Sequence, residues 1–170
     1  MSDINNEMEI ETDGLGVMGF LEETSDGVVG ELSSLLSPGK YVFEILEAVA
    51  APREIRINKD SDETRPAAAV NFRMTIKEVV AVPGIDTESL VGRVFNHSVS
   101  QGPKMSMDEF KKRLVGFCEA VVGGKPTGTF AEVLADMQAK QFQGTLKRTE
   151  RGGNVYVNLV TNSKKDIKPL

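Results

Sequence analysis

The chain of 170 residues has one cysteine, one histidine and no tryptophan, and the shortage of cysteine excludes two kinds of structure. Cys118, being alone, cannot form an internal disulfide or join other cysteines around a metal ion. No apolar run approaches the roughly 20 residues of a membrane-spanning helix. The N-terminus has neither the basic nor the apolar segment of a secretory signal. These absences predict a cytoplasmic protein without a membrane partner.

Basic residues are missing from residues 1–39, which contain nine acidic side chains. The rest of the chain holds 20 basic and 16 acidic residues, a net charge of +4. The sequence therefore predicts three parts: an acidic, largely disordered and flexible arm over residues 1–38, a mildly basic domain over residues 39–162, and a short basic tail over residues 163–170. The arm either keeps the protein soluble or binds a partner, and both interpretations stay open at this point.

Groups that could carry catalysis are scarce and isolated. His97 lies on a predicted strand with no acid or nucleophile beside it in sequence, which is typical of a structural or surface histidine. Cys118 lies on the apolar face of a predicted helix, where a buried, unreactive thiol is expected. The chain has no glycine-rich phosphate loop and no metal-ligand spacing. We therefore expect no catalytic residue, no metal and no cofactor, and hence no enzyme.

Alternation of apolar and polar residues predicts most of the domain as β-strands. The clearest case is the strand from Ala69 to Lys77, in which four apolar residues alternate with Asn71, Arg73, Thr75 and Lys77. Because successive side chains of a strand point to opposite faces, this strand has one core face and one polar, basic face. Similar patterns predict strands at residues 40–51, 92–100, 142–147 and 155–160. Residues 53–66 are interpreted as a long hairpin or a mobile loop.

Two helices are predicted between the third and the fourth of these strands. Ser106 with Glu109, and Thr129 with Glu132, have the spacing of capping boxes, and Gly123-Gly124 ends the first helix. Three strands, a helical insert and two strands is the order of the OB-fold, a five-stranded Greek-key β-barrel. The alternative is an open sheet with a helical pair packed on it.

The polar face of the strand at Ala69–Lys77 favours single-stranded nucleic acid as the ligand. Proteins of this class combine cations that contact phosphates with aromatic rings on which bases stack. The aromatic candidates are Phe95 and Tyr156, which are expected to face away from the core. Strands with one solvated face also carry such residues without a binding role. The candidate binding residues are Arg53, Arg56, Lys59, Asn71, Arg73, Thr75, Lys77, Phe95, Lys147, Arg148, Arg151 and Tyr156.

Residues 39–160 resemble the phage-encoded single-stranded DNA-binding proteins of OB type, a family long classed as a domain of unknown function. The matching segments are Gly39–Ile45, Val70–Ile76, Gly92–Asn96 and the hairpin from Phe142 to Leu159, which carries Gly144. The resemblance implies sequence-tolerant binding of single-stranded DNA in phage replication, recombination or repair, in the cytoplasm of a bacterial host. The resemblance implies no catalytic residues.

The acidic segment of this chain is N-terminal, whereas familiar single-strand binders carry theirs at the C-terminus. It is expected to contact replication or recombination proteins, and a homo-oligomer is compatible with the sequence. The alternative function is a phage structural or assembly (virion) protein with a β-barrel body and a docking N-terminal arm. A third, an accessory subunit that binds a protein through residues 15–21, also stays open.

Overall fold

The computed structural model describes residues 36–83, 87–162 and 165–170. The chain divides into two units, residues 1–31 and 32–170, and the described residues all belong to the second. Residues 1–35, with nearly all of the predicted acidic arm, lie outside the described part of the chain. The elements are β1 (Gly39–Ala50), β2 (Arg53–Arg56), β3 (Thr64–Ala67), β4 (Ala69–Ala81), β5 (Val94–Ser100), α3 (Met107–Val122), α4 (Phe130–Asp136), β6 (Gln141–Arg151), β7 (Asn154–Leu159) and β8 (Lys168–Pro169).

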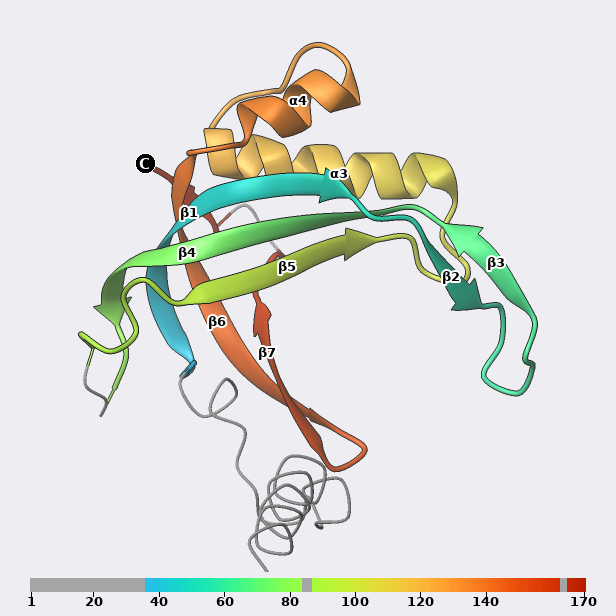
Figure 1. Ribbon diagram of the computed structural model, residues 1–170, viewed down its shortest axis with the longest axis horizontal. Coiled ribbons are helices and arrows are strands. Elements are labelled where there is room, and N and C mark those ends of the chain that lie inside the picture. The colour runs from blue at the N-terminus through green and yellow to red at the C-terminus, as the bar shows by residue number, and fades with distance from the viewer. Residues whose placement is uncertain (1–35, 84–86, 163–164) are drawn as a thin grey trace, which may run out of the picture. The chain divides into compact units, whose positions relative to one another are not determined.

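Five long strands form one antiparallel sheet in the order β5-β4-β1-β6-β7, and β8 extends it by pairing with β6 (Figure 1). The prediction of a mainly β fold with two helices between the third and fourth long strands is confirmed. Within the described residues no ladder joins β5 to β7, so the sheet is open rather than closed. Strands β2 and β3 pair only with each other, as a separate hairpin.

Strand β4 is central to the core because its apolar side chains at positions 70, 72, 74 and 76 all point to one face. Val70, Phe72, Met74 and Ile76 are buried, as the alternation predicts. On β1, Phe43 is fully buried, and its ring lies 5.9 Å from Phe95 of β5 although β4 separates the two strands. Register irregularities in the β1–β4 ladder occur at three places along β1. Bulges of this kind bend a strand, and the sheet curls around its inner face.

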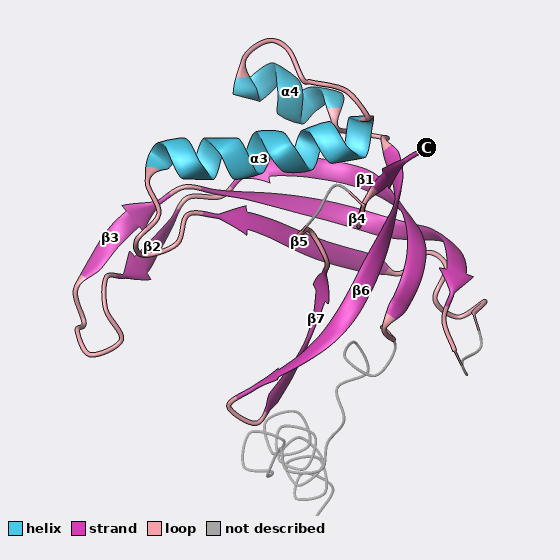
Figure 2. Ribbon diagram, turned by 180° about the vertical axis from the view of Figure 1, so that it is seen from behind, coloured by secondary structure: helices cyan, strands magenta, loops and turns pink. Residues whose placement is uncertain are grey.

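Helix α3 covers the inner face of the sheet, with α4 stacked beyond it (Figure 2). Its buried side is formed by Phe110, Leu114, Phe117, Cys118 and Val121. The Phe117 ring lies 4.7 Å from that of Phe72 on β4. Both predicted capping boxes are present, at Ser106 with Glu109 and at Thr129 with Glu132. None of the helices in the described ranges is long and apolar enough to cross a lipid bilayer.

Gly144, in the middle of β6, is a glycine because the core leaves no room for a side chain. A Cβ atom there would lie 2.7 Å from Leu159 Cδ1 and within 3.3 Å of the rings of Phe43 and Phe142. Those rings are 5.4 Å apart between their centroids, across the β1–β6 ladder. The absent side chain thus lets β6 approach the aromatic core closely.

Candidate nucleic-acid interface

The outer face of β4 carries the four polar residues that the sequence predicts there. Asn71, Arg73 and Lys77 are exposed and Thr75 is half-buried. The β4–β5 register places Ser98 opposite Asn71 and Asn96 opposite Arg73. Directly opposite residues of an antiparallel pair share a face, so Asn96 and Ser98 extend this polar surface. Sequence reasoning missed both, although their alternation with buried Phe95 and Val99 is the signal that would have indicated them.

The charge of this outer face is mixed rather than uniformly basic. Lys77 Nζ lies 3.9 Å from Glu44 Oε2 on β1, and the side-chain amide of Gln141 donates a 2.8 Å hydrogen bond to the same oxygen. Arg73 lies opposite Glu47 in the β1–β4 register. An exposed ion pair such as Lys77–Glu44 is weak, so a polyanion can compete for the lysine. The face therefore offers hydrogen-bond donors together with cations that are only partly neutralised.

The β2–β3 hairpin is joined to the outer face by Arg53. Its Nη2 donates a 2.8 Å hydrogen bond to Ser98 Oγ on β5. Arg56 lies 3.6 Å from Asp62 within the hairpin, and both side chains are exposed. Lys59 lies beyond the end of β2, also exposed. The three predicted cations therefore all lie on the β2–β3 hairpin, which projects from the sheet next to β4 and β5 (Figure 1).

Arg65 fixes the base of this hairpin. Its Nη2 donates to the carbonyl oxygens of Gly102, Pro103 and Met105, at 2.6, 3.0 and 3.2 Å. Gln101 supports the same segment by accepting from the Ala68 amide and donating to the Met105 carbonyl. Between the hairpin and this segment lies a groove of about 1100 Å³. Its lining combines apolar and cationic side chains, namely Ile55, Ile57, Pro103 and Met105 with Arg53, Arg56, Lys59 and Lys104.

Replacing Arg65 with methionine should lower the free energy of unfolding by about 1–3 kcal/mol, because hydrogen bonds to three carbonyl groups are lost. The hairpin should also become a site of rapid cleavage by trypsin at Lys59, which the control variant retains. Urea titration followed by circular dichroism, together with limited proteolysis, measures both effects. Arg56→Met is the control, since it removes only an exposed ion pair. Equal stability losses in the two variants would contradict the anchoring role of Arg65.

The β6–β7 hairpin distributes its predicted residues over two faces. Lys147 lies opposite Asn158, and Tyr156 lies opposite Thr149, so Lys147 and Tyr156 share a face. Tyr156 is 47% exposed, which agrees with its predicted outward orientation and leaves its ring free for stacking.

The two remaining predicted cations of this hairpin differ in their placement. Arg148 lies opposite Val157 and belongs to the other face, whereas Arg151, opposite Asn154 at the turn end of the ladder, shares the face of Lys147 and Tyr156. Gly152 and Gly153 form the predicted tight turn with φ of 57° and 80°, the left-handed values of a type I′ hairpin.

The prediction that Phe95 faces outward is wrong. Its side chain is 7% exposed and contacts Phe43 in the core. Val94 and Val99, in the strand predicted at residues 92–100, are five positions apart and point to opposite faces, so these apolar residues do not indicate which face is buried. The core face is that of Phe95, His97 and Val99, whereas Val94 is 39% exposed. Phe95 is therefore unavailable for base stacking.

His97 and Cys118 both lie against the core. The imidazole of His97 lies 5.0 Å from the Phe117 ring and 6.4 Å from the Phe72 ring. Burial lowers the pKa of His97 to about 4, so that the imidazole is neutral near pH 7. Burial likewise raises the pKa of the Cys118 thiol to about 11. In the described ranges no three His, Cys, Asp or Glu side chains group in a way that could hold a metal ion.

Comparison with known proteins gives no family for this chain. No protein-family model matches the sequence, and no characterised protein matches it significantly.

Proposed function

We propose that the protein is a non-enzymatic, sequence-tolerant binder of single-stranded DNA. The observation that carries this proposal is the polar face of β4 and β5, with Asn71, Arg73, Asn96 and Ser98 in register. The hydrogen bond from Arg53 to Ser98 makes that face continuous with the β2–β3 hairpin. Such a surface contacts a sugar–phosphate backbone along its length without reading base edges.

The strand order supports an OB-type relationship for the domain. The order β5-β4-β1-β6-β7 is that of an OB barrel opened between its third and fifth strands. In this comparison the β2–β3 hairpin lies between the first and second barrel strands, and the β6–β7 turn lies between the fourth and fifth. OB-folds bind oligonucleotides on the face of strands two and three and with these two connections. The predicted cations of this chain lie on the same elements.

Electrostatic contacts dominate the proposed interface because few aromatic rings are available to it. Among the described residues, the aromatic side chains exposed above one third are Phe130 and Tyr156, and Phe130 belongs to α4. Tyr156 supplies one stacking platform near Lys147. Phosphate contacts from Arg53, Arg73 and their neighbours therefore provide most of the affinity. Binding of this kind weakens steeply as the salt concentration rises, because counterions released from the DNA must be recovered.

The double change Arg53→Glu with Arg73→Glu should weaken binding of a fluorescent oligo-dT at least tenfold, because two phosphate contacts become repulsive. Tyr156→Ala should weaken it about fivefold or more by removing a stacking ring. Fluorescence anisotropy between about 50 and 200 mM salt measures affinity and salt slope.

Two charge reversals at exposed positions outside the interface provide the control for the double variant. Lys125→Glu with Lys111→Glu changes the net charge equally and should alter affinity less than threefold. Duplex DNA of the same sequence content should bind more weakly than the single strand. Absence of oligo-dT binding at about 50 mM salt would refute the proposed function.

A further inference from the structure

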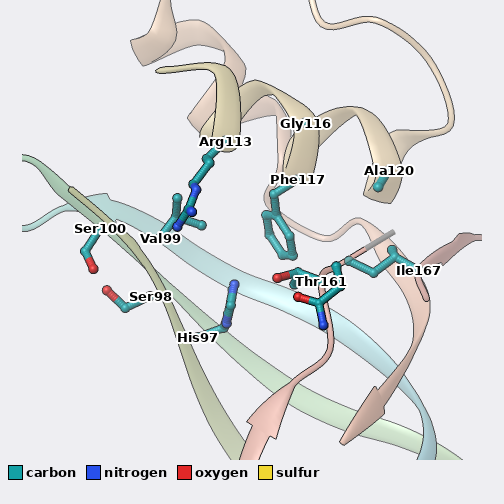
Figure 3. Close-up of a pocket in the computed structure, with 11 residues that line it drawn as sticks. His97, Ser98, Val99, Ser100, Arg113, Gly116, Phe117, Ala120, Thr161 and Ile167 are labelled. Atoms are coloured by element: carbon teal, nitrogen blue, oxygen red, sulfur yellow. The ribbon is translucent and has the colours of Figure 1, made fainter. Parts of the chain in front are cut away.

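A pocket of about 540 Å³ opens where the sheet fails to close. His97 and Val99 on β5 form one wall, and Arg113, Gly116 and Phe117 on α3 form the roof (Figure 3). Thr161, which follows β7, lies opposite β5, and Asn162 also lines the pocket. A volume of this size is typical of pockets that hold a small organic molecule. No element described so far uses this space.

Several polar side chains of the described residues line this pocket without forming hydrogen bonds or ion pairs with one another. Arg113 extends from α3 toward His97 and Val99 (Figure 3). Within the described ranges, no hydrogen bond or ion pair is made by the side chains of His97, Arg113, Thr161 or Asn162. Arg113, Thr161 and Asn162 are exposed and His97 is half-buried, so these side chains are open to a ligand.

The residues that line the pocket indicate what kind of ligand it would bind. Among the described residues that line it, Arg113 carries a permanent positive charge and none has a carboxylate. A guanidinium group favours a phosphate or another planar or tetrahedral anion. The half-buried imidazole of His97, with the buried Phe117 ring behind it at 5.0 Å between centroids, gives the pocket an aromatic wall suited to a flat heterocycle. The wall also offers the nitrogen atoms of His97 as hydrogen-bond partners for ring substituents.

The pocket and the proposed DNA-binding surface meet at β5. Ser98 is among the residues that line the pocket, but its side chain lies on the outer face of β5, where it accepts the hydrogen bond from Arg53. Ser100 lines both this pocket and the groove beside the β2–β3 hairpin. A strand that crosses the outer face of β5 therefore reaches the mouth of the pocket.

We propose that this pocket binds one nucleotide, with its base against the imidazole of His97 and its phosphate on Arg113. The nucleotide is either an unstacked residue of a bound strand, in which case the inference rests on the proposed function, or a free mononucleotide. Both sources present the same chemistry, a heterocycle that carries a phosphate. Sequence reasoning treated His97 as structural and did not consider Arg113.

His97 provides a direct test because it is the single histidine of the chain. Its imidazole signals in a two-dimensional NMR spectrum need no further assignment. Saturable shifts of these signals are expected with deoxythymidine 5′-monophosphate and with oligo-dT. Arg113→Gln should weaken the mononucleotide about tenfold. Lys112→Gln is the matched control, because Lys112 is an exposed cation on the same helix that does not line the pocket, and it should leave the affinity unchanged.

The outcomes separate this inference from the proposed function. If anisotropy shows that oligo-dT binds while neither ligand shifts the His97 signals, the pocket inference fails and the proposed function stands. If only the mononucleotide binds, the proposed function fails and the pocket holds free nucleotide. Equal shifts with inorganic phosphate would reduce the site to an anion site and overturn the role of the aromatic wall. Equal effects of Arg113→Gln and Lys112→Gln would overturn the phosphate contact.

Discussion

Replacing Phe43 with alanine should lower the free energy of unfolding by about 3–5 kcal/mol, the range measured for truncation of a buried phenylalanine. The ring is fully buried and lies close to aromatic rings on three strands of the sheet. It lies 5.9 Å from Tyr41 on its own strand, 5.9 Å from Phe95 on β5 and 5.4 Å from Phe142 on β6. Alanine would leave a cavity that these rings cannot close without moving the strands that carry them.

Urea unfolding followed by far-ultraviolet circular dichroism measures this loss, since the chain has no tryptophan to report by fluorescence. Val49→Ala is the matched control on the same strand, because Val49 is 44% exposed. Its effect should stay within about 0.5 kcal/mol, as for most surface substitutions. Comparable losses in the two variants would mean that Phe43 does not organise the core.

Acidification should destabilise the protein through His97. Burial lowers the pKa of His97 to about 4 in the folded protein, against 6.5 for the exposed side chain. Between these two pH values the unfolded chain binds more protons than the folded one, so stability falls as the pH decreases. Near pH 7 both states are neutral at this residue and the effect is absent. The full loss toward pH 4 is at most about 3 kcal/mol.

The variant His97→Gln isolates this contribution, because glutamine does not titrate. Unfolding free energies of both proteins are compared between about pH 7 and pH 4.5. Carboxyl groups titrate in the same range, but they do so in both proteins and cancel in the difference. The wild-type protein should lose more stability than His97→Gln as the pH falls. Parallel pH profiles would show that His97 is not held neutral by the fold.

The sequence predicts the elements of the domain well where local patterns determine them. The alternation around Phe72 and Met74 is sufficient to define β4 and its buried face. Both helices begin at the predicted capping boxes, because the side chains of Ser106 and Thr129 satisfy nearby backbone groups whatever the rest of the chain does. The turn at Gly152-Gly153 is equally local. Of the two interpretations of residues 53–66, a long hairpin or a mobile loop, the structure has the hairpin.

Features that depend on distant contacts were not predictable in this way. The orientation of Phe95 is decided by its contact with Phe43, and strand β5 itself carries apolar residues in both phases. Strand β8 consists of Lys168 and Pro169 alone and forms only because β6 presents an edge beside it. The pocket at His97 and Arg113 brings together β5, α3 and the chain after β7, which no sequence spacing relates.

The place of β1 in the sheet also has a consequence for how fast the domain forms. Its two neighbours, β4 and β6, both follow it in the chain, and Gly39 pairs with Leu146, roughly 100 residues later. Helices α3 and α4 can begin to form from local contacts, but the ring of Phe43 meets Phe142 only after that long segment has closed. Ladders between such distant residues make folding slow. During synthesis, one edge of β1 therefore stays unpaired until β6 has left the ribosome.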